Sequence, residues 1–162
     1  MRIPIWPMLV LALAVAMGCG GSSTPEPTDA PAVAVDPSGL TSDELENGIG
    51  PAKETVVLGE PDLALAETGK TIFEQKCLSC HKMGERFIGP DLTGVLARRT
   101  PRYVMNMILN PEEMVKRHPE AKKLLAEYLA PMAQQNLTPA DARAVLEYIR
   151  TQPAPSASGA AN

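Results

Sequence analysis

Residues 77–81 of the chain are Cys77-Leu78-Ser79-Cys80-His81. Two cysteines with two residues between them and a histidine directly after them form the pattern of covalent c-type haem attachment. On the helical turn that such a stretch forms, both sulfurs lie close enough to bond the two vinyl groups of one porphyrin, and the imidazole can reach the iron. The stretch therefore predicts one haem c, with Cys77 and Cys80 as attachment points and His81 as an iron ligand.

Two other kinds of site share part of this pattern. A thioredoxin-like Cys-x-x-Cys needs a βαβ setting, and no strand-like run flanks these two cysteines. A structural zinc ion needs four ligands, and outside residues 77–81 the sequence offers only Cys19 and His118 as cysteine or histidine ligands. Both alternatives are therefore weaker than haem attachment.

Length and charge limit the other classes of protein. The chain has 162 residues and a net charge of −4, which allows one domain with extensions. The acidic excess lies in residues 22–61, which hold eight acidic residues and a single base, Lys53. Residues 62–152 hold thirteen bases and eleven acids, an excess too small to indicate a nucleic-acid binder.

The first residues look like an export signal. Arg2 precedes a largely apolar run that is too short to span a bilayer, so residues 1–18 are expected to be a signal peptide. Residues 16–19, Ala-Met-Gly-Cys, resemble a bacterial lipobox in which Cys19 is acylated. The alternative is ordinary cleavage after Ala14-Val15-Ala16, which would leave Cys19 as a free thiol.

The next segment and the end of the chain lack the periodicity of packed elements. Residues 19–61 are rich in Pro, Ser, Thr, Ala and acidic residues and show no sustained period of 2 or 3.6, which predicts a flexible linker. Residues 153–162 are small and polar, and we expect a disordered tail.

The folded unit is expected to span residues 62–152 and to be all-α. Asp62, Thr100 and Thr138 stand where helix N-caps are expected, the last two directly before a proline. The helix that starts at Pro101 is expected to end at Asn110-Pro111, and Pro119 to open another. No stretch of this unit shows a convincing strand pattern.

The block from Gly69 to Arg150 resembles a class I cytochrome c domain. The motifs that carry the resemblance occur in family order: Gly69-x-x-x-Phe73, Cys77 to His81, Gly89-Pro90-x-Leu92-x-Gly94, a methionine in a loop, and Leu146-x-Tyr148-Ile149. The resemblance implies a cytochrome c fold with three to five helices around one covalent haem, preceded by a disordered linker. It also implies that the first and last helices cross at Gly69 and that the Pro90 carbonyl accepts the His81 Nδ1 proton.

The same resemblance implies the second iron ligand. Met132 lies in the irregular segment before the last helix, where the family places its methionine. His118 is the main rival, because it is the other histidine of the chain. A haem iron held by His81 and Met132 has no open position, which implies an electron-transfer protein rather than an enzyme.

The expected role is a one-electron carrier of a periplasmic or membrane-surface respiratory chain. Its partners would be redox proteins (a reductase, an oxidase or a bc-type complex), and Cys19 would attach it to the periplasmic side of a bacterial membrane. Two alternatives remain open: a five-coordinate haem that binds a gas or peroxide, and a fixed haem subunit of a respiratory complex. The first would require that Met132 not be bound to the iron.

Overall fold

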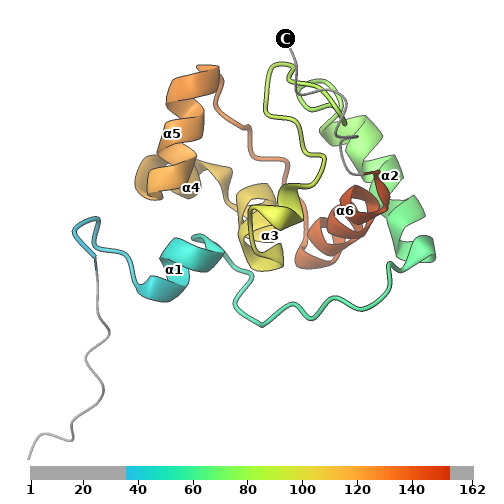
Figure 1. Ribbon diagram of the computed structural model, residues 1–162, viewed down its shortest axis with the longest axis horizontal. Coiled ribbons are helices and arrows are strands. Elements are labelled where there is room, and N and C mark those ends of the chain that lie inside the picture. Colours follow the sequence, from blue (N-terminus) through green and yellow to red (C-terminus); the bar gives the residue numbers. More distant parts are fainter. Residues whose placement is uncertain (1–35, 154–162) are drawn as a thin grey trace, which may run out of the picture. The chain divides into compact units, whose positions relative to one another are not determined.

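The computed structural model describes residues 36–153 and is helical (Figure 1), so the all-α prediction is confirmed. Cys19, the predicted signal peptide and nearly all of the predicted tail lie outside the described residues. The described part has no strand, and none of its helices is long and apolar enough to cross a membrane. Its elements are α1 (Ser42–Asn47), α2 (Leu63–Lys76), the 3₁₀ helix η1 (Val95–Ala97), α3 (Pro101–Leu109), α4 (Pro111–Arg117), α5 (Pro119–Tyr128) and α6 (Pro139–Thr151).

The expected N-caps form as the local chemistry predicts. The Asp62 side chain accepts a hydrogen bond from the Leu65 amide at 2.9 Å, and Thr100 caps α3 with its side-chain oxygen. Thr138 and Asp141 form a capping box at the start of α6. Each cap satisfies backbone N–H groups that the first helical turn cannot.

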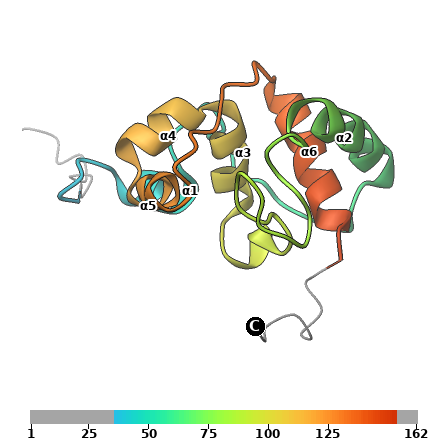
Figure 2. The same cartoon turned by 90° about the horizontal axis from the view of Figure 1, so that it is seen from above.

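Helices α2 and α6 lie against each other (Figure 2), and Gly69 sits at their closest approach. A Cβ at Gly69 would overlap the backbone carbonyl oxygen of Ala144 in α6, so only glycine permits this crossing. Beside it, the rings of Phe73 and Tyr148 pack with their centroids 5.3 Å apart. The crossing that the resemblance implied is therefore present.

Helix α4 was missed by the sequence analysis. Asn110-Pro111 does end α3, as predicted, but Pro111 is also the first residue of α4. Proline suits the first helical position, where its missing N–H has no intrahelical partner. A proline after a helix therefore marks a boundary, but it does not exclude a second helix directly beyond that boundary.

The predicted linker was too long. Residues 36–61 belong to the described structure and include α1, which begins with a capping box between Thr41 and Glu44. Among the described residues this segment adds one α-helix, α1, to the five between residues 63 and 151, and those five agree with the three to five predicted around the haem. Leu40 and Ile49 are buried in a cluster with Met114 and Tyr103, so long-range packing orders a stretch that has no periodicity of its own.

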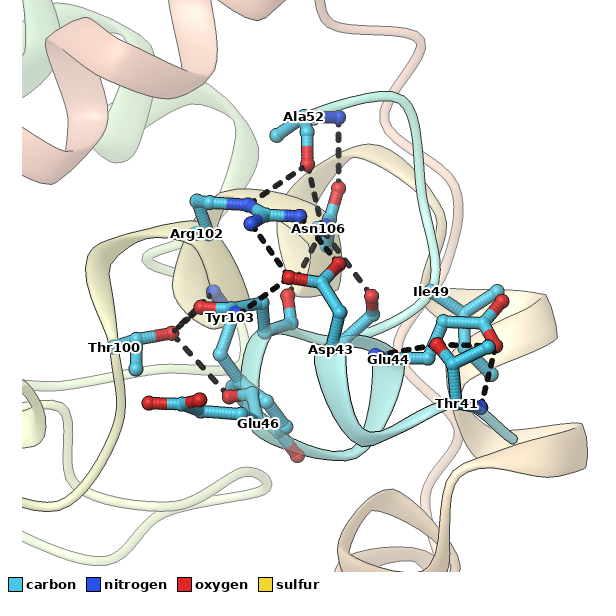
Figure 3. A network of polar contacts seen from close by, with 12 residues as sticks. Thr41, Asp43, Glu44, Glu46, Ile49, Ala52, Thr100, Arg102, Tyr103 and Asn106 are labelled. Atoms are coloured by element: carbon cyan, nitrogen blue, oxygen red, sulfur yellow. Dashed lines mark hydrogen bonds and ion pairs between the residues drawn. The ribbon is translucent and has the colours of Figure 1, made fainter. Parts of the chain in front are cut away.

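Asn106 of α3 anchors this segment (Figure 3). Its amide nitrogen donates to the backbone carbonyls of Asn47 and Ala52 at 2.9 and 3.1 Å, and its carbonyl oxygen accepts from the Ala52 amide at 2.9 Å. Arg102 adds a bidentate ion pair with Asp43 at 2.8 and 2.9 Å. Because Asn106 is fully buried, these bonds replace all of its contact with water.

Candidate functional site

The cysteine motif forms a turn at the end of α2. Cys77 is the C-cap of α2, and its carbonyl accepts hydrogen bonds from the amides of Cys80 at 3.0 Å and His81 at 2.9 Å. Neither Cys77 nor Cys80 is in a disulfide. Cys77 is buried whereas Cys80 is exposed, and burial raises the pKa of the Cys77 thiol to about 11. The turn therefore presents two thiols in different surroundings.

A backbone carbonyl holds the His81 ring. His81 Nδ1 lies 3.1 Å from the Pro90 carbonyl oxygen, so Nδ1 carries the proton and Nε2 is left as a free electron-pair donor. Burial lowers the pKa of His81, although the bond to Pro90 acts in the opposite direction, so the ring stays neutral at pH 7. Gly89 permits this approach, since a Cβ there would lie 2.6 Å from His81 Cε1.

Side chains that accept hydrogen bonds from backbone amides stabilise the loop that carries Pro90. The Gly84 amide donates to Asp91 Oδ1 at 2.8 Å and to Thr93 Oγ1 at 2.6 Å. Asp91 also accepts from the Thr93 amide at 2.8 Å, and hydrogen bonds of this kind hold the pKa of Asp91 below its usual range although burial acts in the opposite direction. These bonds hold the loop between the Cys77–His81 motif and α3 in one conformation around Pro90.

One cavity of about 310 Å³ brings the predicted site residues together. It is lined by Cys77, Cys80, His81, Pro90 and Met132. Apolar side chains from α2, α3, α5 and α6 also line it, as suits a macrocycle with an apolar body: Phe73, Val104, Ile108, Leu124, Leu125, Val145 and Ile149.

Met132 reaches this cavity from the non-helical residues 129–138, which connect α5 to α6. The side chain of Gln134 ties this segment to α3 by donating to the Leu109 carbonyl at 3.0 Å. Met107 of α3 also lines the cavity. Met132 and Met107 are therefore the two methionines among the cavity-lining residues.

His118 lies elsewhere. It is fully buried and caps α5, with Nε2 3.0 Å from the Leu45 carbonyl and Nδ1 accepting from the Glu120 amide at 3.2 Å. Both ring nitrogens are thus engaged with backbone, and His118 is not among the cavity-lining residues. Its role in this structure is to join α1 to the start of α5.

Three polar residues of the cavity wall were not singled out from the sequence. Tyr103 Oη is the one buried side-chain nitrogen or oxygen of the described residues that has no hydrogen-bond partner. Arg98 and Arg99 line the same cavity, and the Arg99 guanidinium lies 5.0 Å from the Tyr103 ring centroid. The sequence offered the adjacent arginines as a signal, but nothing marked Tyr103, a single aromatic within a helix.

Comparison with known proteins agrees with this geometry. The family model described as cytochrome c matches residues 66–153. A solved cytochrome c from Rhodothermus marinus is 46% identical, with a TM-score of 0.62, and the match covers 71% of this chain and 95% of that one. An engineered cytochrome c from the same organism, bound to a carbene intermediate, is 47% identical, with a TM-score of 0.59, and the match covers 67% of this chain and 94% of that one. No curated protein matches the sequence.

Proposed function

The chain belongs to the cytochrome c family, and from this premise we propose that it is a one-electron carrier with His81 and Met132 as axial ligands. The family carries haem c bound covalently with its iron, and Cys77 and Cys80 are present for the attachment. The observation that supports the proposal most directly is that Met132 lines the same cavity as His81, Cys77 and Cys80.

The residues of the cavity suit such a carrier. Bound haem supplies a single electron couple, ferric to ferrous iron. Pro90 orients the His81 ring and strengthens Nε2 as a donor by accepting the Nδ1 proton. A thioether from Met132 would fill the remaining axial position and raise the reduction potential. A protein with both positions filled passes electrons and does not bind substrate at iron.

The polar part of the wall suits the carboxylate side groups of a haem. Burial raises the pKa of the Tyr103 hydroxyl, so it remains a donor, and it has no acceptor within the described residues. We propose that a propionate group would accept this bond, and that Arg98, which has no carboxylate partner among the described residues, would offset its charge, whereas Arg99 already pairs with Glu120 at 2.7 Å. The pairing would remove the cost of a buried, unsatisfied hydroxyl.

Substitution of Met132 tests the proposal, and Met107 provides the control because it lines the same cavity. Met132→Ala should remove the weak far-red absorption of a sulfur ligand from the ferric protein and lower its potential. It should also allow carbon monoxide to bind the ferrous form. Met107→Ala should keep the far-red absorption.

Two outcomes would favour other assignments. If the unaltered ferric protein lacks the far-red absorption, and His118→Ala but not Met132→Ala opens the ferrous iron to carbon monoxide, the ligand is His118 and the buried position of that ring in this structure does not persist. If the unaltered ferrous protein binds carbon monoxide readily at neutral pH, the five-coordinate alternative replaces the carrier.

We further propose that the carrier works on the periplasmic side of a bacterial membrane, attached through Cys19, and exchanges electrons with respiratory redox proteins. The support is the lipobox-like stretch at residues 16–19 and the general export of c-type cytochromes. Two acyl chains give lasting attachment where one gives only marginal binding. Cys19→Ala should release the protein into the soluble fraction, and retention on the membrane would contradict this anchor.

A further inference from the structure

Helix α5 forms one wall of the cavity but is only lightly packed. It contributes Leu124, Leu125 and Tyr128 to the lining, yet Ala121 is its only buried residue. Immediately after it comes the segment 129–138, which carries Met132. The C-terminal end of α5 is therefore where the Met132 segment is attached to the helical wall of the cavity.

Arg86 makes such a contact at the C-terminal end of α5. It belongs to the loop that follows His81 and is 41 positions away from Glu127 in the chain. Its Nη1 lies 2.6 Å from Glu127 Oε1, its Nη2 donates to the Glu127 carbonyl at 3.1 Å, and its guanidinium carbon lies 4.1 Å from the Tyr128 ring centroid. One side chain thus holds a carboxylate, a helix-terminal carbonyl and an aromatic face.

The Arg86 contacts join two walls of the cavity that come from distant parts of the chain. Gly89 and Pro90, close to Arg86 in the chain, line the cavity beside His81. Tyr128 lines it beside the start of the Met132 segment. A guanidinium that binds both sides therefore links the loop orienting His81 to the helix that leads into Met132.

The backbone has a positive φ on either side of Met132. Leu129 has a φ of 54°, in the left-handed region that residues with a bulky side chain disfavour, whereas Asn136, with a φ of 53°, is a residue type that tolerates this region. Leu129 is also 84% exposed, so packing does not hold it there. At Leu129, therefore, the segment is kept in place by its attachments to the rest of the structure and not by the conformational preference of this residue.

We propose that Arg86 is a positioning residue that keeps α5 and residues 129–138 closed over the cavity and so limits how often Met132 leaves the iron. This inference rests on the proposed ligation by Met132. The ion pair alone is exposed, at 57% and 52% of the two side chains, and such pairs contribute little. A second hydrogen bond, to the Glu127 backbone carbonyl, and stacking on the Tyr128 ring by the same guanidinium increase its effect.

Lys82 provides a matched control. It has the same charge, belongs to the same loop and also lies over an aromatic ring, that of Phe87, at 4.3 Å. Its ion pair with Glu85 at 3.0 Å stays within that loop and does not reach α5. Loss of Lys82 therefore changes charge and stacking as loss of Arg86 does, but it breaks no link across the cavity.

The test measures carbon monoxide binding to the ferrous haem-loaded protein. At saturating carbon monoxide the observed rate becomes the rate at which Met132 leaves the iron. Arg86→Gln should raise this rate by about 3- to 10-fold, as expected for loss of an exposed pair plus a cation–π contact. Glu127→Gln removes only the ion pair and should raise the rate by a smaller factor, because the bond to the Glu127 carbonyl and the Tyr128 contact remain. Lys82→Gln should leave it within about 2-fold of the unaltered protein.

Salt gives a second measurement on unaltered protein. Raising the ionic strength should increase the rate toward that of Arg86→Gln, because the Arg86–Glu127 pair is solvent-exposed and screened. The Arg86→Gln protein should respond less. Unchanged helical content by circular dichroism in both variants would exclude general unfolding as the cause.

The possible results separate this inference from the proposed function. Far-red absorption in the unaltered ferric protein, with equal carbon monoxide rates in Arg86→Gln, Glu127→Gln and unaltered protein, would overturn the inference alone. Equal acceleration by Lys82→Gln would do the same, because a bridge to α5 would then be unnecessary. Absence of the far-red absorption from the unaltered protein would overturn the proposed ligation by Met132, and the inference with it.

Discussion

The two sides of the cavity are built in different ways. On the His81 side, backbone groups make the decisive contacts: the Pro90 carbonyl meets the His81 ring, and Gly69 lets α2 touch the backbone of α6. On the Met132 side, side chains do so: Arg86 reaches Glu127 and Tyr128 at the end of α5.

This difference determines how tolerant each side should be to change. Backbone contacts at a glycine crossing have no freedom to adjust, because close-packed interiors transmit any added volume. Exposed side-chain contacts can be lost one at a time at small cost. We therefore expect large, all-or-none effects on the His81 side and graded effects on the Met132 side.

The largest effect is expected from removing both attachment points. In a Cys77→Ser, Cys80→Ser double variant no sulfur of residues 77–81 remains to bond haem, so covalent attachment should be lost completely. The measurement is the haem spectrum of the denatured protein after acid-acetone extraction. Ser79→Ala, within the same turn, should retain covalent haem, and extractable haem in the unaltered protein would contradict the assignment.

Next in size is a methyl group at the helix crossing. Gly69→Ala would place a Cβ on the Ala144 carbonyl oxygen, so α2 and α6 must separate. We expect a loss of about 3 kcal/mol or more in the free energy of unfolding, measured by denaturant titration. Gly59→Ala is the control, because no atom lies within 4 Å of its added Cβ. Equal stability of the two variants would mean that the crossing is not tight.

A smaller and pH-dependent effect is expected at Glu147 of α6. This buried carboxylate lies 2.7 Å from Arg143 Nη2 and 2.6 Å from Arg150 Nη1. Burial alone would raise its pKa, but the hydrogen bonds from the two arginines outweigh burial and hold the pKa below the usual value of 4.5. Its contribution is therefore fully present above pH 4.5 and is lost as the pH falls through the lower pKa of the folded protein.

The corresponding variant is Glu147→Gln. At pH 7 it should be less stable by about 2 kcal/mol, because two guanidinium groups lose their charged partner. The difference from the unaltered protein should narrow as the pH falls below 4.5. Denaturant titrations at pH 7 and at pH 3 to 4 measure it, and a difference that does not depend on pH would contradict the assigned protonation.

The smallest effect, and the only favourable one, is expected on the Met132 side. Leu129 is exposed and has a left-handed backbone at the end of α5, where glycine is the preferred residue. Leu129→Gly should therefore raise the free energy of unfolding by up to about 1 kcal/mol. Leu125→Gly, within the same helix, should lower it, and a loss of stability in both would show that Leu129 contributes contacts.

Local signals in the sequence accounted for much of the His81 side. Cys77, Cys80, His81 and Pro90 lie within 14 consecutive residues, so motif spacing alone brings them close together. Helix caps such as Thr138 act within one turn and are equally visible in sequence. The all-α fold could be predicted because such short-range features, together with the family motifs, are visible in the sequence.

The features that the sequence did not predict depend on distant partners. Arg86 and Glu127 are 41 positions apart, and neither carries a signal that it will meet the other. Helix α1 was missed because its segment is acidic and rich in proline, and its order comes from contacts with Asn106 and Met114. Tyr103 became a candidate only when the structure showed a buried hydroxyl without an acceptor.

The attachment of residues 36–61 to Asn106 also determines where the chain can be cut. The family match begins only at residue 66, so a truncated fragment starting near Asp62 would retain the whole family domain and every cavity-lining residue. It would nevertheless remove the Asn47 and Ala52 partners of the Asn106 amide and take Leu40 and Ile49 away from the cluster with Tyr103 and Met114, and each buried apolar side chain that returns to water costs about 1.5 to 3 kcal/mol. Secreted fragments for expression or crystallisation should therefore begin no later than Asp36, well ahead of the boundary that family similarity suggests.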